Sequence, residues 1–234
     1  MTAPQSTRMI ALHSPFTYTA WGITVPHKSL ITLPSVTDVI GQVWTGTARS
    51  SERAGGVRTE RTFELAYLEY ASLLNLVAGT GKHLWFLVDP VEDNPNRTIE
   101  DYTKNYLQTL AASLMFAQID CYEVMPWPGR VYDKVPPTYA TVVNNIMGMQ
   151  SDLWSFPPTL VKAGTTGIGV AISDTMSLER GGDRPSDLDG LFAMTLPFVM
   201  RGVPVQPISL DRITEPNYLN RVKTLLLSYD FMKP

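Results

Sequence analysis

The chain has 234 residues, 44% hydrophobic and 18% charged, a composition typical of a soluble globular protein with one large domain or two small ones. Its formal net charge of −3 gives no basic stripe able to neutralise phosphates, which argues against nucleic-acid binding. No stretch approaches the roughly 18 apolar residues of a membrane span. Met1 to Arg8 also lacks the apolar segment of a secretory signal. We expect neither nucleic acid nor membrane as a partner, and localisation stays open.

Cofactor and metal chemistry find little support in the sequence. The single cysteine, Cys121, excludes an internal disulfide, and its apolar neighbours predict a small buried core residue. The three histidines, His13, His27 and His83, do not have the spacing of a zinc-binding helix. The glycine-rich stretch 164–169 precedes its predicted strand, whereas a dinucleotide-binding loop follows one. We therefore expect no metal ion and no cofactor.

Four short apolar runs, each followed by a helix-length segment, dominate the first two thirds of the chain. A strand followed by a covering helix, repeated, predicts a parallel sheet with its chemistry at the carboxyl ends of the strands. Four such units are half of an eight-unit barrel. We expect residues 1–160 to form the C-terminal half of a (β/α)8 TIM barrel. The predicted strands are Arg8 to His13, Val39 to Trp44, Leu84 to Val88 and Ile119 to Val124.

Helices are predicted from the periodicity of apolar residues and from their end signals. Between Thr59 and Ala78, apolar residues recur at spacings of three and four, which places them on one face, and Gly79-Thr80-Gly81 supplies the end. Thr98 stands three residues before Asp101, an approximate capping box that opens a second helix. A third helix is predicted from Tyr139 to Leu153. The stretch 45–56 reads as a glycine-rich excursion.

A composition shift at Phe156-Pro-Pro158 and again at residues 164–167 predicts a domain boundary. We expect residues 161–234 to begin a flavodoxin-like, doubly wound α/β domain. Such a sheet commonly has five or six strands, and three are predicted before Pro234, so we expect the chain to be a piece of a longer protein. The predicted strands are 168–172, 203–210 and 222–229, with a helix over 188–200.

Two carboxylates close neighbouring predicted strands. Asp89 follows the strand 84–88 and Glu123 ends the next one, so both would project near one rim of a barrel. Two acidic groups about 5 to 9 Å apart can act as nucleophile or base and as acid in glycosidic bond cleavage. The alternative is structural: Asp89 caps the following turn, and Glu123 pairs with an arginine such as Arg49 or Arg97.

Other side chains near the predicted strand ends could bind a sugar. Indole rings pack on the apolar face of a sugar while their polar edge stays hydrated, although such rings could also simply plug a barrel rim. Loop carboxylates could orient a substrate, cap the loop or be solvated. The candidate substrate-binding residues are His13, Trp44, Arg49, Glu92, Asp93 and Trp127.

Three stretches together resemble a group of large bacterial glycoside-hydrolase-like proteins: 85–95, 122–128 and 225–234. In that group a TIM barrel is followed by a flavodoxin-like domain similar to class I glutamine amidotransferases, as in beta-galactosidases with a trimerisation domain. The resemblance implies the second half of the barrel followed by the start of the next domain. It puts Asp89 at the nucleophile's position, with Asp in place of the usual Glu, whereas Glu123 is not predicted by the family pattern.

We therefore expect the full-length parent of this chain to be a glycoside hydrolase-like protein that acts on a glycan through Asp89 and Glu123. The alternative is a carbohydrate-binding or assembly protein without catalysis. An amidotransferase is not supported, because its cysteine nucleophile would belong in the second domain. Half a barrel leaves two sheet edges unpaired and its inner face uncovered, so we also expect a homo-oligomer.

Overall fold

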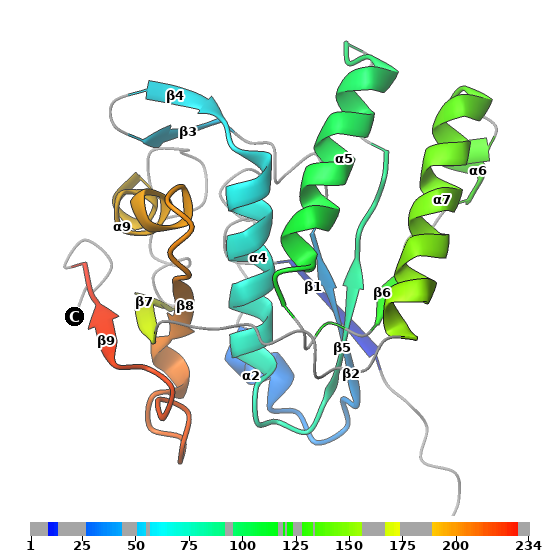
Figure 1. Ribbon diagram of the computed structural model, residues 1–234. Coiled ribbons are helices and arrows are strands. Elements are labelled where there is room, and N and C mark those ends of the chain that lie inside the picture. Colours follow the sequence, from blue (N-terminus) through cyan, green and yellow to red (C-terminus); the bar gives the residue numbers. More distant parts are fainter. Residues whose placement is uncertain are drawn as a thin grey trace, which may run out of the picture.

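The protein is an α/β structure in which helices alternate with the strands of two parallel sheets (Figure 1). The structure, a computed structural model, describes residues 9–13, 27–43, 51–54, 57–91, 96–116, 119, 121–123, 128–132, 134–155, 167–173 and 189–228. No helix in these ranges combines the length and apolar character needed to cross a membrane.

The first sheet has four parallel strands whose order in space follows their order in the chain, as the sequence predicts. The order is β1-β2-β5-β6, and the ladders align His13 with Gln42, Gln42 with Leu87 and Leu87 with Glu123. The observed strands are β1 (Met9–His13), β2 (Asp38–Gln42), β5 (His83–Leu87) and β6 (Tyr122–Glu123). Strands β1 and β2 are each one residue shorter than predicted, β5 has the predicted length but begins one residue earlier, and β6 has two residues where six were predicted.

Helices α2 (His27–Ile31), α4 (Thr62–Val77) and α5 (Ile99–Ser113) all contribute to the core on one face of this sheet, which we call the helix face. Because the side chains of a strand alternate between the two faces of a sheet, every second residue of each strand lies on the helix face, and the pairing of the strands shows which residues these are. The helix face carries Ile10, Val39, Leu84, Phe86 and Tyr122. The opposite side, the open face, carries Met9, Asp38, Ile40, Gln42, His83, Trp85, Leu87 and Glu123.

After β6 the chain forms a short helix, α6 (Pro128–Tyr132), and the long helix α7 (Pro137–Trp154). Helix α7 packs against α5 and α6 at the β6 end of the sheet (Figure 1). Only a narrow stripe of α7 is buried, and much of its remaining surface is exposed. The buried residues are Tyr139, Val143, Ile146 and Gln150.

Two of the predicted helix boundaries are confirmed. The Thr98 hydroxyl accepts a hydrogen bond from the Asp101 backbone N–H at 3.2 Å, so Thr98 caps α5. After α4, Gly79 and Gly81 adopt φ of +76° and +71°, a left-handed backbone that side chains other than glycine rarely adopt. Local chemistry therefore fixes where α4 ends and where α5 begins.

A β-hairpin, which the sequence does not predict, joins β2 to α4. Its strands β3 (Ser51–Ala54) and β4 (Val57–Glu60) pair antiparallel, and β3 lies against α9 (Asp189–Val199) of the second sheet's unit. Neither the sequence of β3, SERA, nor that of β4, VRTE, alternates apolar and polar residues. Without that alternation, the strand periodicity that would reveal a hairpin is missing.

The second sheet has three parallel strands in the order β8-β7-β9. The first of them, β7 (Ile168–Ile172), lies in the centre and matches its predicted range. The other two are shorter than predicted: β8 (Gln206–Ser209) and β9 (Thr224–Leu226), with the short 3-10 helix η3 (Leu210–Arg212) after β8. Helix α9, which precedes β8, begins and ends one residue inside its predicted range.

Helix α4 lies between the two sheets (Figure 1). Twelve of its sixteen residues are buried, so the prediction of a single apolar face is wrong; a helix that is buried on opposite sides is apolar nearly all round. Towards the first sheet, Tyr70 packs edge-on against Phe86 with ring centroids 4.9 Å apart. Towards the second, the Asn75 amide donates to the Pro207 carbonyl at 3.1 Å.

Arg212, at the end of η3, binds the C-terminal end of α4. Its buried guanidinium donates to the carbonyls of Asn75 at 3.2 Å, Leu76, and Ala78 at 2.8 Å. The last carbonyls of a helix have no partner within the helix, and they carry its partial negative charge. Glu215, 2.6 Å from the same guanidinium, balances the charge. One side chain of the second unit therefore satisfies the end of the first unit's central helix.

Replacing Arg212 with methionine should destabilise the whole chain. The change leaves buried helix carbonyls and Glu215 without their charged donor, which costs about 3 kcal/mol or more of unfolding free energy. The matched control is Arg201→Met, because Arg201 bonds the Pro197 carbonyl of α9 from an exposed position. Urea unfolding followed by circular dichroism should show a large loss only for Arg212→Met, and equal losses would contradict this role.

Two glycine-to-alanine changes test how closely α4 lies on the first sheet. A Cβ on Gly41 would come 2.7 Å from Leu73 Cδ1 of α4, whereas a Cβ on Gly148 of α7 would meet nothing within 4 Å. We expect Gly41→Ala to lower the unfolding free energy by about 1–3 kcal/mol through overpacking. Gly148→Ala should raise it by about 0.5–1 kcal/mol, because alanine favours helices. Denaturant unfolding of both variants checks the signs.

Candidate functional site

The candidate site lies at the carboxyl ends of the strands of the first sheet. Glu123 is aligned with Leu87, and the Val88 N–H donates to the Glu123 carbonyl at 3.0 Å, so pairing continues to the residue before Asp89. Strand spacing then puts the Cα atoms of Asp89 and Glu123 about 8 Å apart. Leu87 and Glu123 lie on the open face, whereas Asp89 follows the end of β5 and its carboxylate is close enough to Tyr106 of α5 to affect the pKa of that phenol.

Asp89 is held in a tight turn. Its side chain is buried, and Oδ1 accepts a hydrogen bond from the Val91 N–H two residues later at 3.0 Å. Such an Asx turn is a common way for aspartate to end a strand. The structural alternative for Asp89, a cap on the following turn, is therefore realised.

Two tyrosines surround the Asp89 turn. The Tyr139 hydroxyl of α7 donates to the carbonyl of Pro90, the residue after Asp89. Burial, with smaller effects from Tyr139 and from the Asp89 carboxylate, raises the pKa of Tyr106 well above its ordinary value. Tyr106 therefore stays a neutral phenol near a carboxylate. The sequence marks both tyrosines only as helix residues, because contacts between distant segments leave no periodic signal.

Glu123 has different surroundings. It is half-buried, and its carboxylate makes no hydrogen bond or ion pair with any residue that the structure describes. The alternative partner Arg97 instead bonds Glu60 at 2.6 Å and lies 3.9 Å from Asp101. Cys121, two residues before Glu123, is half-buried rather than in the core, because it lies on the open face near the sheet edge.

The predicted substrate-binding residues fall mostly beyond what can be described. Of His13 the structure gives only the backbone, at the carboxyl end of β1 and level with Gln42. The other five lie outside the described residues: Trp44, Arg49, Glu92, Asp93 and Trp127. They stay predictions from sequence.

The amino ends of the same strands carry a hydrogen-bonded polar group. Asp38 of β2 accepts from the Thr37 hydroxyl at 2.6 Å and from the Trp85 indole at 3.3 Å, and His83 lies at 3.3 Å. The Thr37 hydrogen bond is the main cause that lowers the pKa of Asp38, against the opposing effect of burial. Within the described ranges, no three His, Cys, Asp or Glu side chains are grouped to hold a metal ion.

Comparison of the chain with family models, with curated proteins and with solved structures finds no match. The geometry of the strand ends is therefore the basis for the functional argument.

The stability contribution of Asp38 should depend on pH. Because its pKa is lowered in the folded state, the unfolded state takes up the proton first as the pH falls. The contribution is present above the ordinary aspartate pKa of about 3.8 and is lost as the pH falls through the lowered pKa of the folded state. Asp38→Asn should cost about 1–2 kcal/mol at pH 7. That deficit should shrink towards pH 3 in urea unfolding, whereas Asp152→Asn, at an exposed site on α7, should show none.

Proposed function

We propose that the chain is a glycoside hydrolase-like protein that acts on a glycan through Asp89 and Glu123. The observation that carries the proposal is the pairing of β5 and β6, which are parallel and adjacent: β6 ends at Glu123, and β5 ends at Leu87, two residues before Asp89. In parallel α/β proteins, catalytic groups gather at the carboxyl ends of the strands. Acidic residues on neighbouring strands are the arrangement that glycosidic bond cleavage needs.

We infer further that residues 1–160 are four units of a TIM barrel. In a doubly wound sheet the strand order reverses and helices cover both faces. Among the described residues the first sheet has neither feature, since β1-β2-β5-β6 follows the chain and α2, α4 and α5 share one face. A barrel has this arrangement, with helices outside and side chains filling the interior. The open face of the sheet would then line the interior.

The surroundings of the two carboxylates suit different roles. Asp89, fixed by the Val91 N–H, suits an ionised nucleophile or a group that stabilises positive charge on the sugar. Glu123, half-buried and without a partner among the described residues, suits proton transfer to the leaving group. A Cα separation of about 8 Å is compatible with carboxyl groups about 5 to 9.5 Å apart.

Side chains beside this rim would bind the sugar. Indole rings would stack on the apolar face of a sugar ring, and charged groups would bond its hydroxyls. The proposed substrate-binding residues are those of the sequence prediction: His13, Trp44, Arg49, Glu92, Asp93 and Trp127.

One observation favours the alternative function, carbohydrate binding or assembly without catalysis. Asp89 is only 5% exposed, and one of its oxygens is engaged by the turn. A carboxylate so enclosed could serve the fold or accept a hydrogen bond from a glycan hydroxyl. Glycan binding without product release would support this alternative.

For residues 161–234 we propose a flavodoxin-like domain. Its support is the order β8-β7-β9, in which the first strand of the sheet lies between the second and the third. The flavodoxin-like order 2-1-3-4-5 begins in this way. Helix α9 joins β7 to β8 as the parallel crossover that such a sheet requires.

Amide substitutions test the two catalytic roles. We expect Asp89→Asn and Glu123→Gln each to lower turnover about 10²-fold or more, because they remove charge or proton transfer and keep the volume. A panel of 4-nitrophenyl glycosides and reducing oligosaccharides supplies the substrates, and released sugar is measured. Asp38→Asn is the matched control, because it changes a carboxylate of the same sheet at the opposite ends of the strands. It should lower stability but keep turnover at a temperature where it is folded.

Full turnover in both amide variants would contradict the proposed roles. Equal losses in all three variants, with equal losses of stability, would assign the effect to folding instead of chemistry.

A further inference from the structure

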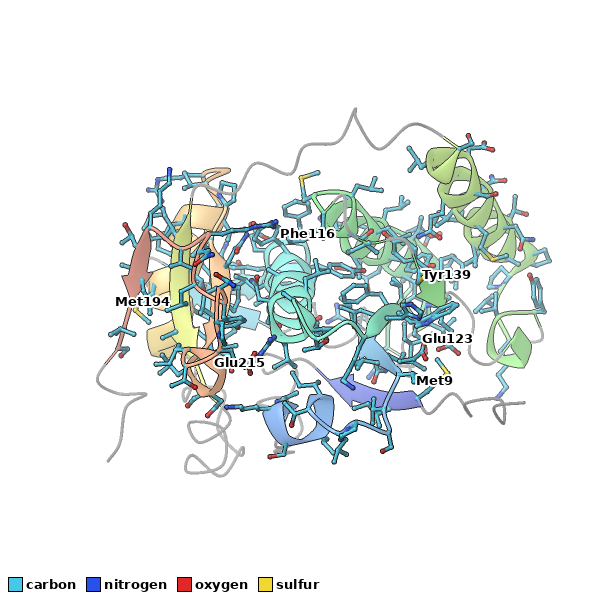
Figure 2. All side chains as sticks on the ribbon, turned by 90° about the horizontal axis from the view of Figure 1, so that it is seen from below. Met9, Phe116, Glu123, Tyr139, Met194 and Glu215 are labelled. Carbon is cyan, nitrogen blue, oxygen red and sulfur yellow. The ribbon has the colours of Figure 1, made fainter. Side chains whose placement is uncertain are left out.

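The open face of the first sheet is partly exposed although it carries large apolar side chains. Met9 is 50% exposed, and Ile40, Trp85 and Leu87 are half-buried. Figure 2 shows Met9 and Glu123 together on the side of the sheet away from α4. These partly exposed apolar side chains stand beside the polar residues Asp38, Gln42, His83 and Glu123 of the same face, a mixture that a protein partner could cover.

Both edges of this sheet are also open within the described part of the chain. There β1 pairs with β2 alone, and β6 pairs with β5 alone. Unpaired edge strands present rows of backbone donors and acceptors that template pairing with another strand. The molecule thus combines an incompletely covered face with two strand edges at its opposite borders.

We propose that a second copy of this chain covers the open face, and that the two four-stranded sheets close into one eight-stranded parallel barrel. The two edges are self-complementary, because a two-fold axis along the strands pairs β6 of each copy with β1 of the other, parallel in both places. Four strands from each copy give eight. Eight is the number at which a barrel closes around an interior just wide enough for side chains to fill.

Helix α7 provides an independent argument for this occupant. It follows β6 and lies at the β6 end of the sheet (Figure 1), packed against α5 by a narrow stripe. In a barrel, such a helix covers the groove between its own strand and the next one. That next strand would be β1 of the second copy. Apolar side chains for this contact are exposed on one flank of α7: Met149 at 57% and Leu153 at 45%.

Closure by a second copy would also change the proposed site. All eight strands of the barrel run in the same direction, so the Asp89 and Glu123 pairs of both copies would meet around one rim. The inference itself rests on the edges and faces of the sheet, and it holds or fails separately from glycan hydrolysis.

The mass of the chain in solution tests the proposal. Sedimentation velocity at about 1 to 50 µM should give a dimer, twice the chain mass of 26.0 kDa. Leu87 is partly exposed in the monomer and would become fully buried in the barrel, so Leu87→Glu would bury a charge at the interface. This variant should be a 26.0 kDa monomer with an unchanged circular dichroism spectrum. The matched control is Leu107→Glu on α5, 46% exposed and away from the open face, which should remain a dimer.

Three results would each overturn the proposal: a monomeric wild-type chain, a dimeric Leu87→Glu variant, or assemblies that grow beyond a dimer. A monomeric wild-type chain would show that no second copy covers the open face. Should Leu87→Glu lose its helical spectrum, hydrogen exchange of the wild-type chain decides. Amide protection in β1 and β6 should then rise with protein concentration, and protection that is independent of concentration would overturn the proposal.

Discussion

The burial of α4 between two sheets is the constraint on which the rest of the structure depends. A helix packed on both sides has carbonyls at its C-terminal end that water reaches poorly, and an unsatisfied buried carbonyl costs about 1–3 kcal/mol. Arg212 meets this cost with a guanidinium from the second unit. Because the same helix packs on Phe86 and bonds Pro207, the two sheets share one core and are held together through α4.

Sequence patterns predicted the parts of this fold that local chemistry decides. The C-terminal end of α4 followed from Gly79 and Gly81, and the N-terminal end of α5 followed from Thr98. The strand order of the first sheet followed from strands alternating with helices. The single apolar face predicted for α4 was wrong for a physical reason. Spacings of three and four describe one contact surface, and α4 has two because the second sheet returns to pack on it.

Contacts between distant segments could not be predicted in the same way. Arg212 lies 136 residues from Leu76, and Tyr139 lies 49 residues from Pro90, so no periodicity connects either pair. For Asp89, the sequence left a turn cap and a reacting group as alternatives; the structure shows the turn cap, and the reacting group stays a prediction. The Val91 N–H that makes Asp89 a cap also fixes one carboxylate oxygen at the end of β5.

The two ends of the first sheet differ in how their acidic groups are satisfied, and this difference bears on function. At the amino ends, Asp38 is bonded to Thr37 and Trp85, and its lowered pKa shows that the fold stabilises the charge. At the carboxyl ends, Glu123 is half-buried with no partner among the described residues. At the amino ends, the described residues bind the acidic group within the fold. At the carboxyl ends they leave Glu123 unbonded, and this is why we propose a ligand or a proton transfer there rather than a role in folding.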